Sequence, residues 1–495
     1  EFAYSHSAKE KGVEFKQNIQ TLNSANLDAK DINLNSKSNT QISSSNLRAT
    51  NKLNIEAGND IYVVGANTNE STETKEKSKG FFSKKESHLM AINQKVISSN
   101  LNAGDISLKA GGNLALVSSN LNANNINLNA DENVIVDANH NVEASQSFTK
   151  SSRFSLKPTS LYESNLHLLE KGDKRAVASN LNANENININ ANNISLKGAN
   201  LNSGSDINLN AELIAISNTN DESYHKEEHK SSRVGILKPN EVLKDIVVDL
   251  KRKLNPLKEA KDKFSSLSTP TFVIGKTSAK FESNSQEAKS SNIKAGKNIN
   301  INANKDINIV ASNVDAKENL NLKANEAVEI SSANSISNAK SESVSRKILG
   351  KQSASASSTN EEVVSSNLNA KNINIASNQD TTLSGSNISA DESLDIKADS
   401  INLLPASYSL ESSSKFKDSG FGDLIKSNGE ESSSNYNLAT STLLAKDISL
   451  SSNTINALAS IIEATNVDVN TELLNFLKST LLQLNVCNMS PTFGR

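Results

Sequence analysis

The sequence is poor in the residues from which most globular cores and chemical sites are built. Its 495 residues include no tryptophan, two methionines and one cysteine, and only 4% are aromatic. The lone cysteine, Cys487, excludes an internal disulfide framework and a multi-cysteine zinc site. The 52 basic and 55 acidic residues nearly cancel, which argues against the broad basic surface of a nucleic-acid-binding protein.

Membrane and targeting signals are missing as well. No apolar run approaches the roughly 18 residues that cross a bilayer, so the chain is not expected to span a membrane. No secretion leader opens the sequence, which begins at Glu1 rather than Met. We therefore expect the chain to be part of a longer polypeptide whose targeting signal lies elsewhere.

What the chain has instead is a repeat of about twenty residues. Residues 99–103 and 119–123 both read Ser-Asn-Leu-Asn-Ala, and Leu108 aligns with Leu128 at the same offset of 20. Within each repeat the apolar residues alternate, as in Ile126-x-Leu128, which is the period of a strand with one buried face. The short strands are separated by Asn, Ala, Gly and Asp, and Asn and Asp suit tight corners.

Short strands that recur with such corners predict an all-β fold, a parallel β-helix in which each repeat forms one coil. A coil that buries about five aliphatic side chains gains roughly 8–15 kcal/mol. Ordering about twenty residues costs on the order of 30 kcal/mol, so a coil is stable only within a stack. We expect roughly 12–16 coils in a shaft on the order of 60–75 Å long. Asn side chains at equivalent positions are expected to form hydrogen-bonded ladders along it.

The residues predicted to form the aliphatic core occupy alternating positions of the best-defined repeats. They are Leu101, Ile106, Leu108, Leu114, Leu116, Leu121, Ile126, Leu128, Val134, Val136, Leu181, Ile187, Ile189, Leu201, Ile207 and Leu209. All six prolines lie outside the repeat segments, as hydrogen-bonded ladder strands require.

Five segments rich in Ser, Lys and Glu interrupt the repeat. They span about residues 66–95, 138–177, 217–288, 332–362 and 405–440. Because each segment leaves the array and returns to it, we expect β-hairpin or loop excursions, with disorder as the alternative for the longest one. Several carry a basic residue beside small apolar residues, as in the Lys-Gly-Phe-Phe-Ser-Lys of residues 79–84.

The repeat array spans residues 20–470, which leaves two ends to explain. Residues 1–19 are expected to form an incomplete coil or a linker. Residues 471–495 have leucines at helical spacing and predict an amphipathic helical tail or cap. A second helix is predicted inside the longest excursion, from Asn240 as its cap to Pro256.

Residues 225–229, His-Lys-Glu-Glu-His, are the sharpest chemical candidate. They fit the H-x-x-E-H pattern, in which two histidines on a helix bind zinc and a glutamate activates water. The flanking residues are polar and the sequence suggests no third ligand, so we interpret the segment as solvated charge. The other histidines are isolated. The sequence therefore predicts no catalytic residue, no cofactor and no metal site, and the chain is not expected to be an enzyme.

The Ser-Ser-Asn-Leu-Asn-Ala motif at 20-residue spacing, together with the Lys-Gly-Phe-Phe-Ser-Lys excursion, resembles the haemagglutinin repeats of filamentous haemagglutinins. It is similar, more specifically, to the second repeat block of contact-dependent growth inhibition exoproteins, over about residues 20–470. The resemblance implies a right-handed β-helix within a two-partner secretion exoprotein of a Gram-negative bacterium. Such proteins are exported by an outer-membrane transporter and stay secreted or associated with the cell surface. The asparagine-proline secretion domain and the Val-Glu-Asn-Asn motif that precedes a toxin are not found in this sequence.

The expected function is therefore a structural and adhesive shaft segment that contacts a target-cell receptor or presents and delivers a toxin, with the excursions as the contact surface. One alternative is a polysaccharide-active β-helix enzyme, which calls for three or more carboxylates on adjacent coils along one face. The other alternative is a non-functional remnant of a larger exoprotein gene.

Overall fold

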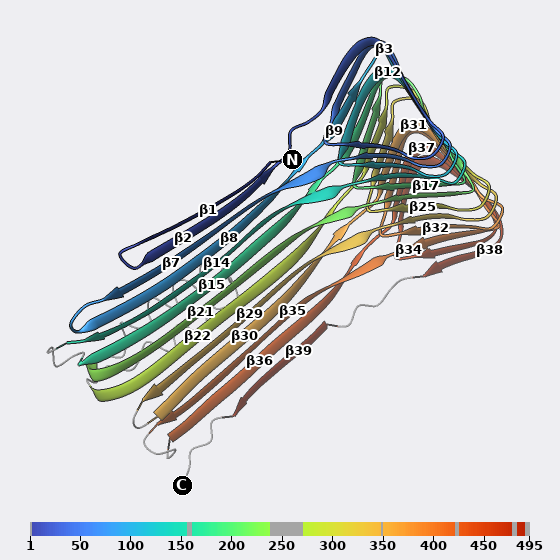
Figure 1. The fold of residues 1–495 in the computed structure, drawn as a ribbon. Helices are drawn as coiled ribbons and strands as arrows, with labels where there is room; N and C mark the ends of the chain where they lie inside the picture. Colours follow the sequence, from blue (N-terminus) through green and yellow to red (C-terminus); the bar gives the residue numbers. More distant parts are fainter. Residues whose placement is uncertain are drawn as a thin grey trace.

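In a computed structural model of the chain, the described residues form strands joined by turns, with no helix among them. These residues are 2–155, 161–237, 271–347, 350–420, 425–477 and 483–490. The strands form a 26-stranded parallel sheet and a 13-stranded antiparallel sheet. We call the first the shaft and the second the outer sheet, which extends away from the shaft in Figure 1. No helix in the described ranges is long and apolar enough to cross a membrane.

In the shaft, each strand pairs in parallel with its equivalent one repeat away. Ile106 lies opposite Ile126 and Leu108 opposite Leu128, which is the offset of 20 in the sequence. Grouped by such pairings, the described strands form twelve stacked coils in a solenoid-like arrangement. The coils are β3 (Asn26–Ser36) and β4 (Thr40–Ser43); β5 (Asn46–Ala57) and β6 (Ile61–Val64); β9 (Ser99–Asn102), β10 (Asp105–Ala110) and β11 (Leu114–Val117); β12 (Ser119–Ala130) and β13 (Asn133–Asp137); β16 (Ser179–Asn190) and β17 (Asn193–Lys197); β18 (Ala199–Ser203), β19 (Ile207–Ala211) and β20 (Leu213–Ser217); β23 (Asn292–Ala295), β24 (Ile299–Ala303) and β25 (Ile307–Val310); β26 (Asn313–Ala316), β27 (Asn319–Ala324) and β28 (Val328–Ser331); β31 (Asn367–Ala376) and β32 (Asp380–Ser384); β33 (Asn387–Lys397) and β34 (Ser400–Leu404); β37 (Thr442–Leu458); and β38 (Ile461–Leu477).

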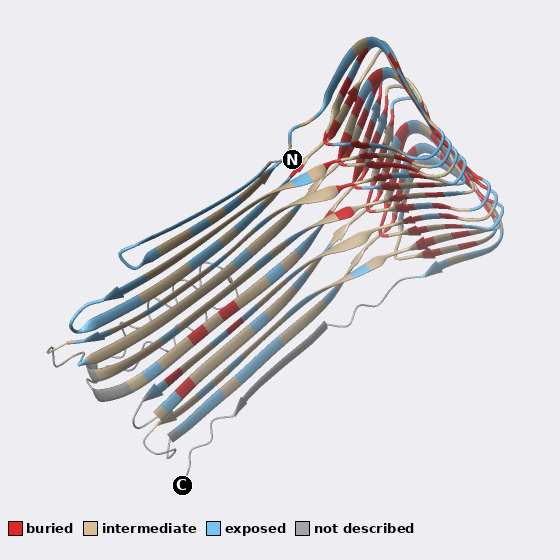
Figure 2. Ribbon diagram, in the orientation of Figure 1, coloured by how far each residue is buried: buried red, intermediate tan, exposed pale blue. Residues whose placement is uncertain are grey.

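The hydrophobic core runs along the inside of the shaft and is almost wholly aliphatic. Each of the sixteen residues predicted for the core, from Leu101 to Leu209, has at most 1% of its surface exposed. Figure 2 shows the buried positions concentrated in the shaft and the outer sheet mostly intermediate or exposed. The shaft therefore holds nearly all of the apolar burial that stabilises the fold.

The outer sheet is built from hairpins that leave the shaft after every second coil. Its strands are β1 (Phe2–Glu10), β2 (Val13–Thr21), β7 (Ala66–Lys79), β8 (Ser83–Ile97), β14 (Asn139–Phe154), β15 (Tyr162–Val177), β21 (Thr219–Leu237), β22 (Thr271–Lys289), β29 (Ala333–Lys347), β30 (Gly350–Val364), β35 (Ala406–Gly420), β36 (Ile425–Ala439) and β39 (Gln483–Ser490). Two coils advance the shaft by about 9.6 Å, and one hairpin is two strands, or about 9.6 Å, wide. Each hairpin therefore lies beside the next at hydrogen-bonding distance.

Where one coil continues into the next without a hairpin, a residue with positive φ makes the corner. These residues are Ser44, Ser118, Gly198, Ala311, Gly385 and Ala459, with φ between 44° and 57°. At Gly198 a side chain would also collide with the chain, since a Cβ atom there would lie 2.4 Å from Cγ2 of Thr219. Plain corners therefore use a left-handed turn, and hairpins replace this turn at alternate coils.

The ends of the chain differ from the sequence-based expectation. Residues 1–19 are expected to be an incomplete coil or linker, but residues 2–19 belong to the hairpin β1–β2, whose second strand continues to Thr21 and pairs with β7. The predicted helical tail over 471–495 is wrong where the structure describes it, because β38 continues to Leu477 in parallel with β37 and β39 pairs with β36. Leucines at helical spacing gave way here to a pairing that extends the stack. The helix predicted from Asn240 to Pro256 lies outside the described residues.

Candidate functional site

The outer sheet is the candidate functional surface, and buried serines fix it to the shaft. Each of these serines stands where a hairpin returns, and its Oγ donates to the carbonyl of a residue where the hairpin leaves. All five are fully buried. The bonds, of 2.6–2.8 Å, run from Ser99 to Val64, Ser179 to Asp137, Ser291 to Ser217, Ser366 to Ser331 and Ser441 to Leu404. Each bond closes the base of one hairpin, and the carbonyl accepts it beside a backbone N–H of the neighbouring corner, as Asp137 does from Ser118. We call these five residues the clamp serines.

An asparagine follows four of the five clamp serines, and these asparagines belong to a ladder of amides that runs up the shaft. Each Asn Nδ2 in the ladder donates to the Oδ1 of the Asn one coil below, at 2.7–3.0 Å. The ladder consists of Asn26, Asn46, Asn100, Asn120, Asn180, Asn200, Asn292, Asn313, Asn367 and Asn387. The predicted amide ladder is confirmed, and these shaft side chains are taken up by contacts between coils.

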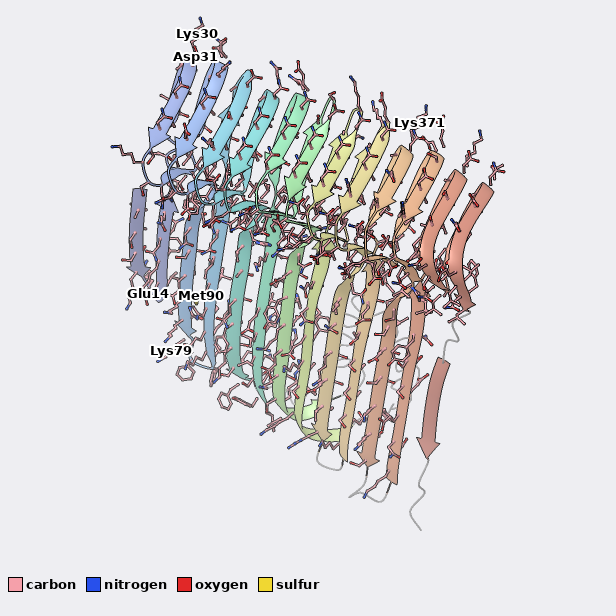
Figure 3. The ribbon with its side chains drawn as sticks, turned by 90° about the vertical axis from the view of Figure 1, so that its right-hand side faces the viewer. Glu14, Lys30, Asp31, Lys79, Met90 and Lys371 are labelled. Carbon is pink, nitrogen blue, oxygen red and sulfur yellow. The ribbon has the colours of Figure 1, made fainter. Side chains whose placement is uncertain are left out.

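One corner of the shaft lacks the run of carboxylates on adjacent coils that a polysaccharide-active site calls for. Backbone hydrogen bonds join successive coils along one corner at Glu212, Lys305, Glu326, Gln379 and Asp399. Each carboxylate on this corner is thus followed by a lysine or an amide on the next coil. Figure 3 shows Lys30 and Lys371 at the edge of the shaft that lies away from the outer sheet.

At the far end of the outer sheet, the tips of the first two long hairpins expose aromatic rings. Phe81 is 94% exposed, Phe82 59% and Phe154 61%. The rings of Phe81 and Phe82 meet edge to face at 4.6 Å, and the backbone N–H of Phe154 donates to the carbonyl of Phe82 at 2.8 Å. The two tips therefore form one apolar patch with Leu161 and Tyr162, which we call the tip patch. Solvent exposure of rings of this size is typical of a surface that binds another molecule.

The faces of the outer sheet carry paired charges. Lys75 Nζ lies 2.6 Å from Oε1 of Glu73, and Nε2 of His88 lies 2.8 Å from the same oxygen. The hydrogen bond from Lys75, supported by the one from His88, lowers the pKa of Glu73 to about 2. Glu73 therefore stays ionised well below the ordinary range of a glutamate.

A shallow cavity of about 510 Å³ lies on the outer sheet between β15 and β29. Tyr224 and Asn284 are among its lining residues, and the phenolic O–H of Tyr224 donates to Oε2 of Glu170 at 2.8 Å. Partial desolvation, followed by this hydrogen bond, raises the pKa of Tyr224 to about 12. The phenol therefore remains a neutral hydrogen-bond donor at physiological pH.

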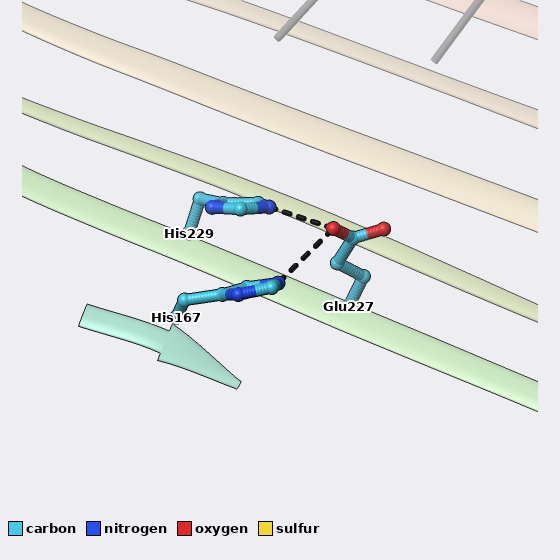
Figure 4. Close-up of side chains that lie close together, drawn as sticks. All are labelled: His167, Glu227 and His229. Atoms are coloured by element: carbon cyan, nitrogen blue, oxygen red, sulfur yellow. Dashed lines mark hydrogen bonds and ion pairs between the residues drawn. The ribbon is translucent and has the colours of Figure 1, made fainter. Parts of the chain in front are cut away.

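The His-Lys-Glu-Glu-His segment lies on strand β21 rather than on a helix, which changes its geometry. Because side chains alternate along a strand, His225, Glu227 and His229 share one face. His167 of β15 lies directly opposite His229, and their rings stack with centroids 4.0 Å apart. Oε1 of Glu227 lies 2.7 Å from Nε2 of His229 and 3.1 Å from Nε2 of His167, as Figure 4 shows. His167, the third member of the cluster, comes from the neighbouring hairpin β14–β15 and was not suggested by the sequence.

Two features of this surface were missed from the sequence. One is the serine clamp, for which the signal in the sequence is a serine that recurs where each excursion returns to the shaft. The pairing of successive hairpins was also missed, although the alternation of two coils with one excursion was visible.

Comparison with known proteins gives the same repeat. The family described as Hemagglutinin repeat matches residues 81–166, 169–238, 273–349 and 348–477. No curated protein and no solved structure matches the chain. The first match begins in the turn between β7 and β8 and ends in β15, so the family unit includes hairpin strands as well as coils. Since the four matches cover more than half of the sequence, the chain belongs to the hemagglutinin repeat family.

Proposed function

We propose that this chain is a structural and adhesive shaft segment of a secreted, cell-surface exoprotein of a Gram-negative bacterium. In this proposal the shaft is a right-handed β-helix that serves as a stiff rod, and the outer sheet contacts another cell or presents a toxin to it. Export through a narrow outer-membrane transporter of the two-partner secretion type suits such a chain, because each coil can fold onto the preceding one as it emerges.

The tip patch is the observation that carries the proposal. The leucines, asparagines and serines of the shaft described above already contact one another in the aliphatic core, the amide ladder and the serine clamps. The rings of Phe81, Phe82 and Phe154 are instead largely exposed. They lie at the tips of the hairpins β7–β8 and β14–β15, and these hairpins extend away from the shaft in Figure 1. Exposed aromatic side chains are the residues most enriched in binding surfaces. They lie where a partner can reach them without disturbing the coils.

Cell binding by the purified chain tests the proposal. We expect saturable binding to bacterial or host cells, and a loss of at least tenfold in affinity when the three phenylalanines are replaced together by serine, as removal of hot-spot residues predicts. The matched control replaces exposed apolar residues on the shaft, Ile135→Ser and Leu213→Ser, which are 36% and 38% exposed.

Circular dichroism checks that both variants keep their β structure. Equal binding by the tip variant and the unchanged chain would contradict the tip patch as the contact surface. A folded chain that binds no cell would contradict the adhesive role itself.

A further inference from the structure

The cluster of His167, Glu227 and His229 goes beyond an adhesive surface. One donor atom from each of these side chains lies within 4.8 Å of the other two, and within the described ranges this is the one group of three such side chains that lies close enough to share an ion. We propose that the cluster binds a divalent cation of the zinc class and thereby joins two neighbouring hairpins.

The donor set suits that class of ion. Imidazole nitrogens and a carboxylate oxygen are ligands of Zn²⁺, which binds His at about 2.0–2.1 Å and Glu at about 2.0–2.2 Å. In tetrahedral geometry, donors at these distances lie about 3.4 Å from one another. The two nitrogen–oxygen distances of 3.1 Å and 2.7 Å are shorter than this by about 0.3 and 0.7 Å. Rotations of these partly exposed side chains therefore make room for the ion in place of the two hydrogen bonds.

Both histidines already present Nε2 to the same carboxylate oxygen. The two rings are nearly parallel, with 11° between their planes, and Figure 4 shows both ring nitrogens directed at Glu227. The side chains of His167 and His229 are 39% and 41% exposed, and that of Glu227 is 15% exposed. An ion can thus enter from solvent, and a water molecule can complete its coordination.

The surroundings hold the carboxylate in place. Glu227 lies between two apolar cross-strand neighbours, Leu169 on β15 and Phe281 on β22, and Phe281 is only 6% exposed. Nε2 of His225 lies 3.6 Å from the second carboxylate oxygen. His225 is therefore a positioning residue, since it sits beside the oxygen that does not face the other two imidazoles. Lys171 of β15 lies opposite His225 in the pairing of β15 with β21.

The ligands come from two different excursions. His167 belongs to the hairpin β14–β15, whereas Glu227 and His229 belong to β21 of the next hairpin. A bound ion therefore adds a cross-link at an interface that otherwise depends on backbone hydrogen bonds and surface contacts. Neither hairpin alone supplies all three ligands.

Titration of the full 495-residue chain with Zn²⁺ by calorimetry, and with Co²⁺ by visible absorption, tests the proposal. We expect one equivalent to bind. We expect His167→Asn, Glu227→Gln and His229→Asn each to weaken binding by roughly 100-fold or more, because the loss of a ligand should exceed the 10–100-fold effect of an outer partner. His225→Asn should fall within that smaller range.

His88→Asn is the matched control, since His88 also bonds a glutamate on the outer sheet but has no second histidine beside it. Circular dichroism shows whether each variant keeps its β structure. The absence of saturable binding, or an equal loss of binding in His88→Asn and His229→Asn, would overturn the site. Hydrogen exchange gives a second readout: Zn²⁺ should slow exchange in β15 and β21 but not in β29 and β30. Binding without that local protection would overturn the cross-link.

Discussion

Deleting one plain coil should break the outer sheet at a chosen place while the shaft stays stacked. Residues 180–199 form such a coil, and their removal joins Ser179 directly to Asn200. Asn200 already pairs with Asn180 at an offset of 20, so it takes over that position in the ladder. The hairpins on either side of the deletion are then separated by one coil, about 4.8 Å, instead of the two coils that a hairpin width requires.

The size of the effect follows from the interface between β15 and β21. Its register runs from Tyr162 opposite Val234 to Lys174 opposite Glu222, which is 13 residue pairs. An antiparallel ladder has about one backbone hydrogen bond per residue pair, each contributing roughly 0.5–1.5 kcal/mol net, so the interface is worth on the order of 10 kcal/mol. Because two hairpins cannot occupy the width of one, we expect this interface to open.

Hydrogen exchange measures this opening strand by strand. Amides of β15 and β21 should lose protection in the deletion variant, whereas those of β29 and β30 should keep it. The matched control deletes residues 100–179, two coils together with one hairpin, which preserves the alternation. In this control variant, β8 should pair with β21. The interfaces β8–β14 and β15–β21 have the same register relative to the hairpin base, with Gln94 opposite Val142 in the first and Lys174 opposite Glu222 in the second. Unchanged protection of β15 and β21 after deletion of the single coil would refute the spacing argument.

Three further predictions concern single residues. Asn180→Ala removes two amide bonds of the ladder and should lower the free energy of unfolding by about 1–3 kcal/mol in a denaturant titration. Ser179→Ala removes the bond to the carbonyl of Asp137 and leaves the buried N–H of Ser119 without its acceptor, so it should cost about 1–3 kcal/mol. Ser7→Ala, at an exposed position, should cost under about 0.5 kcal/mol, and equal losses would contradict the clamp. Glu73, with its pKa lowered to about 2, stabilises the fold above its ordinary pKa of 4.5 and loses this contribution as the pH falls through about 2. Its carboxyl NMR signal should titrate near pH 2, and Lys75→Met should move that midpoint upward.

Sequence reasoning succeeded for the shaft because the same local pattern recurs at a fixed offset. Leu108 and Leu128 alternate with polar residues in the same way, and an alternation with period two has one buried face whatever surrounds it. The Asn ladder follows from the same offset, since equivalent residues stack directly.

Local patterns were less informative where a neighbouring segment decides the outcome. The leucines near residue 473 have helical spacing, yet Leu473 lies opposite Thr454 in a parallel pair that continues the shaft. The histidines at 225 and 229 fit a helical metal motif, yet their strand places Glu227 between them and brings in His167 from 60 residues away.

The sequence by itself determined the coil, its length, its aliphatic core and the places where the chain leaves the shaft. Those features depend on residues that are close in sequence or related by one repeat. Only the tertiary structure decided that the excursions pair with one another, because that pairing depends on the match between the rise of two coils and the width of one hairpin. It likewise decided that exposed phenylalanines from two hairpins form one patch and that two histidines share one carboxylate, since these contacts join segments that only the stacking of coils brings together.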